Sequence, residues 1–248
     1  MTETTFLKLG VIGDPVEHSA SPRLQRRLLD AAGVPGSYEA IRVPAGTGAS
    51  AIEDLRERGY VGLNVTTPLK REAFARAEWH DATALATGSV NTLVLGERIE
   101  GYNTDGIGVL GGLADAGLRD VAGSRILVLG AGPTARTAVA TLVAAGAAVF
   151  VWNRTVAKAE ALVREFDAHA FAAGLRFDAV LSTLAPGAEP NDRALVAAVI
   201  DAPVFVDANY AARATLARFF GRRGVDGLAM LEHSARASFE LWRVAFAP

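Results

Sequence analysis

A glycine-containing turn in the second half of the chain has the residue types and the spacing of a nucleotide phosphate site. The strand-like run Arg125–Leu129 leads into Gly130-Ala131-Gly132-Pro133-Thr134-Ala135, a G-x-G-x-x-A variant, and an apolar helical segment follows. The first glycine permits a tight turn, the second lets backbone N–H groups approach a pyrophosphate, and the small Ala135 permits close helix–strand packing. The helix start would supply the anion site. A plain strand–turn–helix corner is the alternative for this turn taken alone.

The end of the next predicted strand, 147–152, indicates which dinucleotide would fit. An NAD-binding fold usually places Asp or Glu there for the ribose hydroxyls, whereas this chain has Asn153-Arg154-Thr155. A guanidinium suits a phosphate through charge and paired hydrogen bonds, and Thr155 adds a hydroxyl donor. Lys158 adds charge, or is only a solvated helix residue. We therefore predict NADP as cofactor, with a solvated surface arginine at position 154 as the alternative.

Four polar segments in the first half follow predicted strands, which is where α/β sheets assemble their sites. They are G-D-P-V-E-H-S-A-S-P (13–22), N-V-T-T-P-L-K (64–70), G-S-V-N-T (88–92) and G-Y-N-T-D-G (101–106). Each has a simpler reading by itself: Ser21-Pro22 can be a helix start, and Asn64 or Asn103 can be turn residues.

In this order, and followed by the dinucleotide turn, the four segments resemble the signature blocks of the shikimate dehydrogenase family. The resemblance extends over essentially the whole chain. Its most specific block is N-V-T-x-P-x-K from Asn64 to Lys70, and N-T-D at 103–105 comes next. The resemblance implies a two-lobed α/β enzyme that transfers a hydride between NADP and a small carboxylated ring.

The resemblance also implies roles for individual side chains. Ser19 and Ser21 would hold the substrate carboxylate through their hydroxyls. The ring hydroxyls would be bound by Thr66, Asn91 and Asp105, and Lys70 would be the catalytic lysine.

Lys70 and Asp105 have the residue types that this chemistry requires. Hydride transfer to a ring carbonyl develops negative charge on oxygen, so a cation or proton donor must lie beside that oxygen. The ammonium of Lys70 is suited to this task, and the carboxylate of Asp105 would hold it in place. A surface ion pair near a hinge is the alternative for these two residues.

The chain departs from the family pattern mainly in its second half. Pro133 replaces the last glycine of the usual G-A-G-G, which removes one backbone donor but remains compatible with a helix start. The loop L-S-T-L-A-P-G-A (181–188) stands where the family has N-A-T-P-x-G-M, near the nicotinamide. We expect altered cofactor contacts at these two places.

Two further departures concern the substrate. D-A-N-Y (207–210) keeps the Asp and Tyr of its block, and Tyr210 would still point into the site, but Ala211 and Ala212 replace Asn-Pro. M-L-E-H-S (230–234) resembles the block that carries a substrate-binding Gln, with His233 in its place. Because a His donates or accepts and can charge near neutral pH, His233 leaves the preferred ring acid open. Gln25 also stands where many members have His.

These segments must be positioned by two α/β units. In the first half, 7–12, 36–43 and 61–65 are predicted strands, with helices at 21–32 and 48–58 between them, so the sheet should be largely parallel. In the second half the predicted strands are 125–129, 147–152, 179–182 and 204–208. We predict a substrate-binding domain at 1–105, completed by a C-terminal segment 230–248, and a Rossmann-like NADP domain at 106–229.

A helix predicted at 235–246 would pack its three aromatic residues into the first domain. Their spacing is typical of a core face, and they are Phe239, Trp242 and Phe246.

Composition excludes several function classes. The 248 residues are 50% apolar and 21% charged, with a formal net charge of -2, which is ordinary for a folded cytosolic protein. The basic residues are dispersed, which argues against a nucleic-acid partner. No cysteine is present, and the four His form no ligand-spaced pair, which argues against thiolate chemistry and a metal site. No leader or membrane-length apolar run is evident, so we expect a cytoplasmic protein. We also expect a monomer or a homodimer.

The predicted function is reversible reduction of 3-dehydroshikimate to shikimate with NADPH, in the pathway that supplies aromatic amino acid precursors. One alternative is a related enzyme acting on quinate or an aminoshikimate. Another alternative, from a different class, is a catalytically silent NADP-binding sensor, which retention of Lys70 with Asp105 disfavours.

Overall fold

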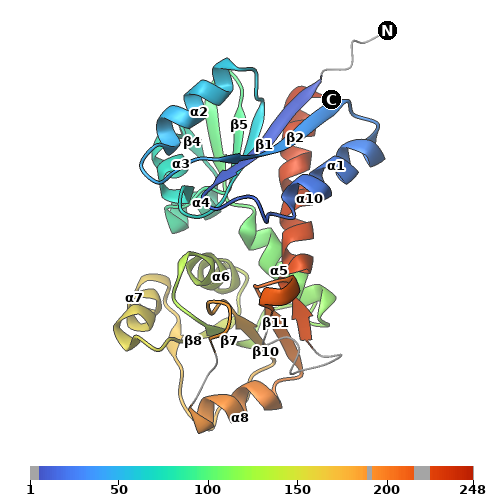
Figure 1. The fold of residues 1–248 in the computed structure, drawn as a ribbon. Helices are drawn as coiled ribbons and strands as arrows, with labels where there is room; N and C mark the ends of the chain where they lie inside the picture. The colour runs from blue at the N-terminus through green and yellow to red at the C-terminus, as the bar shows by residue number, and fades with distance from the viewer. Residues whose placement is uncertain (1–5, 189–191, 215–223, 248) are drawn as a thin grey trace. The chain divides into compact units, whose positions relative to one another are not determined.

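The computed structural model describes residues 6–188, 192–214 and 224–247, which form two compact units. The first unit contains residues 1–104 and 234–248, and the second contains residues 105–233 (Figure 1). Asp105 and residues 230–233 therefore belong to the second unit, across the boundaries drawn from the sequence.

The first unit is built on a six-stranded mixed sheet in the order β2-β1-β3-β5-β6-β4. Its strands are β1 (Leu7–Gly13), β2 (Gly36–Arg42), β3 (Gly62–Val65), β4 (Trp79–His80), β5 (Thr92–Leu95) and β6 (Ile99–Tyr102). Strands β2, β1 and β3 are parallel, as predicted, while β5 runs antiparallel to both β3 and β6. The β5–β6 hairpin was not predicted. Its first strand starts inside a segment that the sequence indicated as a loop.

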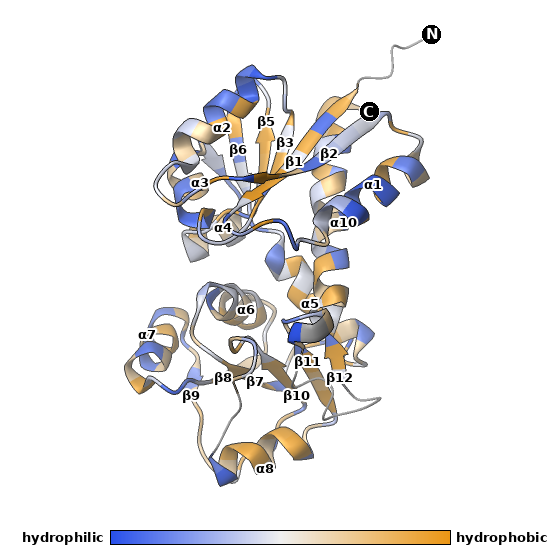
Figure 2. Cartoon of the chain, viewed as in Figure 1, coloured by the Kyte–Doolittle hydropathy of each residue, from blue (hydrophilic) through white to orange (hydrophobic). Residues whose placement is uncertain are grey.

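The helices of the first unit are α1 (Ser21–Ala32), α2 (Gly48–Glu57), α3 (Lys70–Arg76), α4 (Ala82–Thr87) and part of α10 (Gly227–Phe246). Hydropathy favours a sheet inside and helices outside: β1 is buried almost throughout, whereas α1 is mostly hydrophilic on its outer side (Figure 2). As predicted, Phe239 and Trp242 are buried, and Phe246 packs against the same cluster. The indole of Trp242 also donates a hydrogen bond to the Leu93 carbonyl at 2.9 Å, which fixes α10 against β5.

The second unit has a six-stranded parallel sheet in the order β12-β11-β10-β7-β8-β9. Its strands are β7 (Arg125–Leu129), β8 (Ala148–Trp152), β9 (His169–Ala170), β10 (Ala179–Ser182), β11 (Val204–Asp207) and β12 (Gly224–Asp226). Four of these strands lie where the sequence predicted them, whereas the short edge strands β9 and β12 were not predicted.

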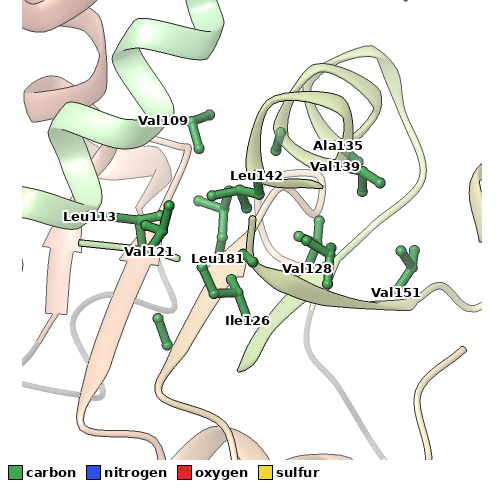
Figure 3. Close-up of a cluster of buried hydrophobic side chains, with 14 of the residues drawn as sticks. Val109, Leu113, Val121, Ile126, Val128, Ala135, Val139, Leu142, Val151 and Leu181 are labelled. Carbon is green, nitrogen blue, oxygen red and sulfur yellow. The ribbon is translucent and has the colours of Figure 1, made fainter. Parts of the chain in front are cut away.

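The helices of the second unit are α5 (Asp105–Asp115), α6 (Pro133–Ala144), α7 (Val156–Phe166), α8 (Arg193–Asp201), a short 3-10 helix η1 (Ala211–Arg213) and the first residues of α10. In Figure 3, Val109 and Leu113 of α5 lie beside Leu142 of α6, over the strand residues Val128 and Leu181. This core, with the close approach of Gly106 to Thr141, fixes α5 against the last turns of α6.

Candidate active site

In the first unit, the loops after β1 and β3 lie side by side. The two strands pair in parallel with Ile12 opposite Val65, so their carboxyl ends meet at one edge of the sheet. The Thr66 N–H donates to the Ile12 carbonyl at 2.9 Å. A Cβ atom at Gly13 would lie 2.3 Å from Cγ2 of Thr66, so only glycine allows the loops to approach this closely. Thr66 is thereby brought next to the segment that leads to Ser19 and Ser21.

Lys70 is the first residue of α3 and is anchored through its backbone. The turn before it is closed by the Leu69 N–H, which donates to the Thr66 carbonyl at 2.9 Å. The Lys70 carbonyl accepts from the Val90 N–H at 3.0 Å. Because Asn91 follows Val90, this hydrogen bond brings the backbone of Asn91 close to that of Lys70, and both residues are predicted ligands.

Ser19 and Ser21 lie at the start of α1. The Ser19 hydroxyl oxygen accepts from the Ser21 N–H at 3.2 Å, which leaves the hydroxyl proton of Ser19 for another acceptor. The Ser21 hydroxyl lies near the phenol of Tyr38 and acts to lower its pKa, an effect smaller than that of burial. Burial raises the pKa of Tyr38 well above its usual value, so the phenol stays protonated. Its own proton goes to Oδ1 of Asn64 at 2.7 Å.

Asn91 is buried and both ends of its amide are hydrogen-bonded. Its Oδ1 accepts from the N–H of Thr104 at 2.8 Å, and the Thr92 hydroxyl also donates to it at 3.0 Å. On the other side, its Nδ2 lies 3.3 Å from the Ser234 hydroxyl on α10. Sequence reasoning missed the groups that surround Asn91, because they lie on three separate segments of the chain.

In the second unit, the predicted phosphate turn connects β7 to α6. Gly130 has a φ of +114°, and its N–H donates to the Trp152 carbonyl at 2.7 Å. Helix α6 begins at Pro133 and lacks a side-chain cap. The first N–H bonded back into the helix is that of Arg136, on the Gly132 carbonyl, so the preceding N–H groups of Thr134 and Ala135 have no intrahelical acceptor. These open donors fit a dinucleotide pyrophosphate, and Pro133 is accommodated as predicted.

The predicted 2′-phosphate site follows β8. Asn153 donates through Nδ2 to the Thr155 carbonyl at 2.9 Å, which shapes the turn into α7. Arg154, Thr155 and Lys158 are exposed. Within the described residues, no acidic side chain pairs with Arg154, and this turn contains no acid. A basic, exposed turn of this kind fits a phosphate better than a ribose diol.

The comparisons with known proteins agree with this geometry. Residues 11–93 match the model of the shikimate dehydrogenase substrate binding domain, and residues 112–185 match that of shikimate / quinate 5-dehydrogenase. The chain is 38% identical to the shikimate dehydrogenase (NADP(+)) of Hyphomonas neptunium, over 94% of this chain and 90% of that protein. It is 35% identical to the enzyme of the same name from Methanosarcina mazei, covering 94% and 91% of the two chains. The chain belongs to the shikimate dehydrogenase family.

Solved structures show the same two-domain, Rossmann-like fold. Shikimate dehydrogenase from Aquifex aeolicus superposes with a TM-score of 0.85 at 32% identity, covering 100% of this chain and 96% of that one. Shikimate 5-dehydrogenase from Thermus thermophilus, crystallised with NADP(H) and shikimate, gives a TM-score of 0.84 at 32% identity, covering 95% and 93%. The predicted family and fold class are confirmed.

The first turns of α10 contain the block 230–234, which departs from the family pattern at His233. Nε2 of His233 lies 3.0 Å from Oδ2 of Asp115, within the second unit, and its ring lies against Gly111 of α5. The next residue, Ser234, belongs to the first unit and contacts Asn91. The substrate-binding role given to His233 stays a prediction. The structure brings Ser234, which the sequence did not indicate, to the predicted ligands.

The altered loop 181–188 is held by Asn209. Its Nδ2 donates to the Leu184 carbonyl at 2.8 Å and to Oδ1 of Asp207 at 3.0 Å. The buried Asp207 thus supports the loop through Asn209, although most of the family block is changed. Tyr210 follows directly and is half-buried.

Asp105 is the first residue of α5, in the second unit. A Cβ atom at its neighbour Gly106 would lie 2.5 Å from the Thr141 hydroxyl of α6, so α5 and α6 approach closely at this point.

In the described part of the chain, no helix has the length and apolarity to span a membrane, and no cluster of His, Asp and Glu could hold a metal ion.

Proposed function

We propose that the chain is a shikimate dehydrogenase that interconverts 3-dehydroshikimate and shikimate with NADP. The observation that carries this proposal is the phosphate turn with open backbone donors followed by Arg154 in place of an acid. It occurs in a chain that matches NADP-dependent shikimate dehydrogenases over 94% of its length. This combination favours the predicted dehydrogenase over the sensor alternative, because the substrate half is retained as fully as the cofactor half.

In this function the cofactor would be held by the turn 130–135 and by Asn153, Arg154, Thr155 and Lys158. Bound NADPH supplies a hydride to the ring carbonyl. The backbone donors of the turn would bind the pyrophosphate, and Arg154 would pair with the 2′-phosphate. Tyr210 would close the site beside the ring.

The side chains of the first unit would bind and orient the ring acid. The hydroxyls of Ser19 and Ser21 would hold its carboxylate, while Thr66 and Asn91 would bind ring hydroxyls. As the carbonyl oxygen gains negative charge, the ammonium of Lys70 would stabilise it and donate a proton. Asp105 would hold that ammonium in place, which keeps the proton and the oxygen aligned.

The experiment is a steady-state assay at the nicotinamide absorbance with shikimate, quinate and an aminoshikimate, each with NADP and with NAD. We expect turnover of shikimate with NADP, and a fall in kcat of about a hundredfold or more in Lys70→Ala. Lys158→Ala controls for loss of a lysine charge at a distance from the chemistry, and should affect KM for NADP only. Activity confined to another ring acid would support the quinate or aminoshikimate alternative, and silence with every pair would support the sensor.

We also propose that the protein acts in the cytoplasm as a monomer or homodimer without a nucleic-acid partner. The dispersed charges and the net charge of -2 support the part of this proposal that concerns nucleic acid. Light scattering on the purified protein would test the oligomeric state, and cell fractionation would test the location.

A further inference from the structure

The first unit contains a buried network of side-chain hydrogen bonds around the proposed ligand Asn91, and most of its members have no role of their own in the proposed chemistry. Its centre is formed by the amides of Asn64 and Asn91. The hydroxyl groups around them come from β5, from the end of the segment before α5 and from α10, and they are Thr92, Thr104, Ser234 and Ser238, each less than a tenth exposed.

A backbone group shows which end of the Asn91 amide is the oxygen. The Thr104 N–H can only donate, so the Asn91 atom that lies 2.8 Å from it must be the oxygen Oδ1. The hydroxyls of Thr92 and Thr104 also donate to this oxygen, at 3.0 and 3.1 Å. The nitrogen Nδ2 therefore faces the Ser234 hydroxyl, 3.3 Å away, so the donor end of the amide is the end beside α10.

Ser234 is itself held in one orientation. Its hydroxyl is bonded to the hydroxyl of Thr104 at 2.8 Å, and Ser238 donates to its carbonyl at 3.0 Å. Ser238 in turn accepts from Nδ2 of Asn64 at 3.0 Å. The opposite end of the Asn64 amide accepts from Tyr38, so the network extends from α10 to the helix start at Ser21.

We propose that Ser234 is a positioning residue for substrate binding, acting through Asn91. Its oxygen accepts from Nδ2 and holds the amide so that a donor is directed at an oxygen lone pair of the ring acid. Ser234 does not need to touch the substrate for this effect. The inference rests on the proposed function, because it assumes that Asn91 binds a ring hydroxyl.

A double-mutant cycle tests this role. In Ser234→Ala we expect KM for shikimate to rise about three- to tenfold, the loss of one hydrogen bond, while kcat and KM for NADP change less than about twofold. The shikimate dissociation constant, measured by calorimetry in all four proteins, should rise by the same three- to tenfold for Ser234→Ala alone and by less than about twofold for Ser234→Ala in the Asn91→Ala background. An equal effect of Ser234→Ala in both backgrounds, or no effect on KM, would overturn the proposal.

Two further variants keep the test independent of folding. Ser234→Cys retains a weak donor and acceptor of similar shape, and should give an intermediate KM. Ser50→Ala, on the exposed face of α2, controls for a serine hydroxyl that bonds a backbone carbonyl and should leave KM unchanged. A crystal structure of Ser234→Ala gives a readout without turnover. A rotated or disordered Asn91 amide supports the proposal, and an unchanged amide contradicts it.

The outcomes separate this inference from the proposed function. If the wild-type protein turns over shikimate while Ser234→Ala leaves its KM unchanged, only the positioning role fails. If the wild-type protein is inactive on shikimate, the proposed function fails, and the crystal structure of Ser234→Ala still decides whether Ser234 orients Asn91.

Discussion

The two units hold their candidate ligand groups in different ways. In the first unit, the amides of Asn64 and Asn91 are bonded on both sides by buried side chains from distant segments. In the second unit, the phosphate turn is shaped by the backbone, through the positive φ of Gly130 and the open helix start at Pro133. Side chains can therefore vary in the turn more freely than in the network. This difference is consistent with the departure from the family pattern at Pro133, where the turn keeps its backbone donors.

The sharpest test of a backbone-shaped turn is Gly130→Ala. At a φ of +114° an L-residue is strained, and the new Cβ would lie 2.4 Å from the Thr183 hydroxyl. We expect the free energy of unfolding, measured with urea, to fall by about 3 kcal/mol. The NADP dissociation constant should rise at least about tenfold, because the open donors would be displaced.

Gly174→Ala is the matched control for that strain. Gly174 has a φ of +83° but nothing lies within 4 Å of an added Cβ, so only the backbone cost applies, about 1 kcal/mol. NADP affinity should be unchanged. Equal losses of stability in the two variants would show that the contact with Thr183 is unimportant.

The corresponding test of the side-chain network is Asn64→Leu. The substitution leaves the Tyr38 phenol and the Ser238 hydroxyl without their amide partner in a buried place, and should lower the free energy of unfolding by about 2 kcal/mol. KM for shikimate should rise as well, because both Ser21 and Asn91 are linked to this amide.

Asn64→Asp separates the two halves of the amide. It keeps an acceptor for Tyr38 but removes the donor to Ser238 and Thr92. A smaller loss of stability than in Asn64→Leu is expected, measured by urea denaturation. If both variants matched the wild-type protein in stability and KM, the network would not be what distinguishes the first unit.

Cofactor choice gives a smaller effect at an exposed site. Arg154→Ala should raise KM for NADP about tenfold while leaving KM for NAD within about twofold, because only NADP carries the 2′-phosphate. As a control, Arg164→Ala removes an equal charge from the last turn of α7, the helix that follows Arg154, where Arg164 pairs with Glu160. Equal changes in KM for NADP and NAD in Arg154→Ala would show that this arginine does not bind the 2′-phosphate.

The sequence was most informative where a pattern is local. The first three strands, helix α1 and the turn at Gly130 lie where their periodicity and glycines indicated. The β5–β6 hairpin was missed because its strands are short and flank polar segments. Helix α10 begins at Gly227, eight residues before the predicted start at Ala235. The side chain of Asp226 accepts from the Leu228 N–H at 3.0 Å at this helix start, a capping signal that the sequence reading overlooked.

Pairings between distant residues were beyond such reasoning. Ser234 and Asn91 are separated by 143 positions, and nothing in either local pattern indicates that they meet. The same holds for His233, whose pairing with Asp115 depends on how α10 packs on α5. The candidate ligands therefore come from the sequence, whereas the groups that contact and orient them come from the structure.

The smallest expected effect is also the most direct check on the comparison between the units. In Thr134→Ala and Thr134→Val the side chain at the second position of α6 changes while its backbone N–H is kept. Because the proposed phosphate donors in this turn are backbone groups, KM for NADP should change less than about twofold in both variants. Steady-state kinetics at saturating shikimate would measure it. A rise of about fivefold or more in both would mean that the Thr134 hydroxyl is a ligand, and that the second unit also depends on side chains to hold the cofactor.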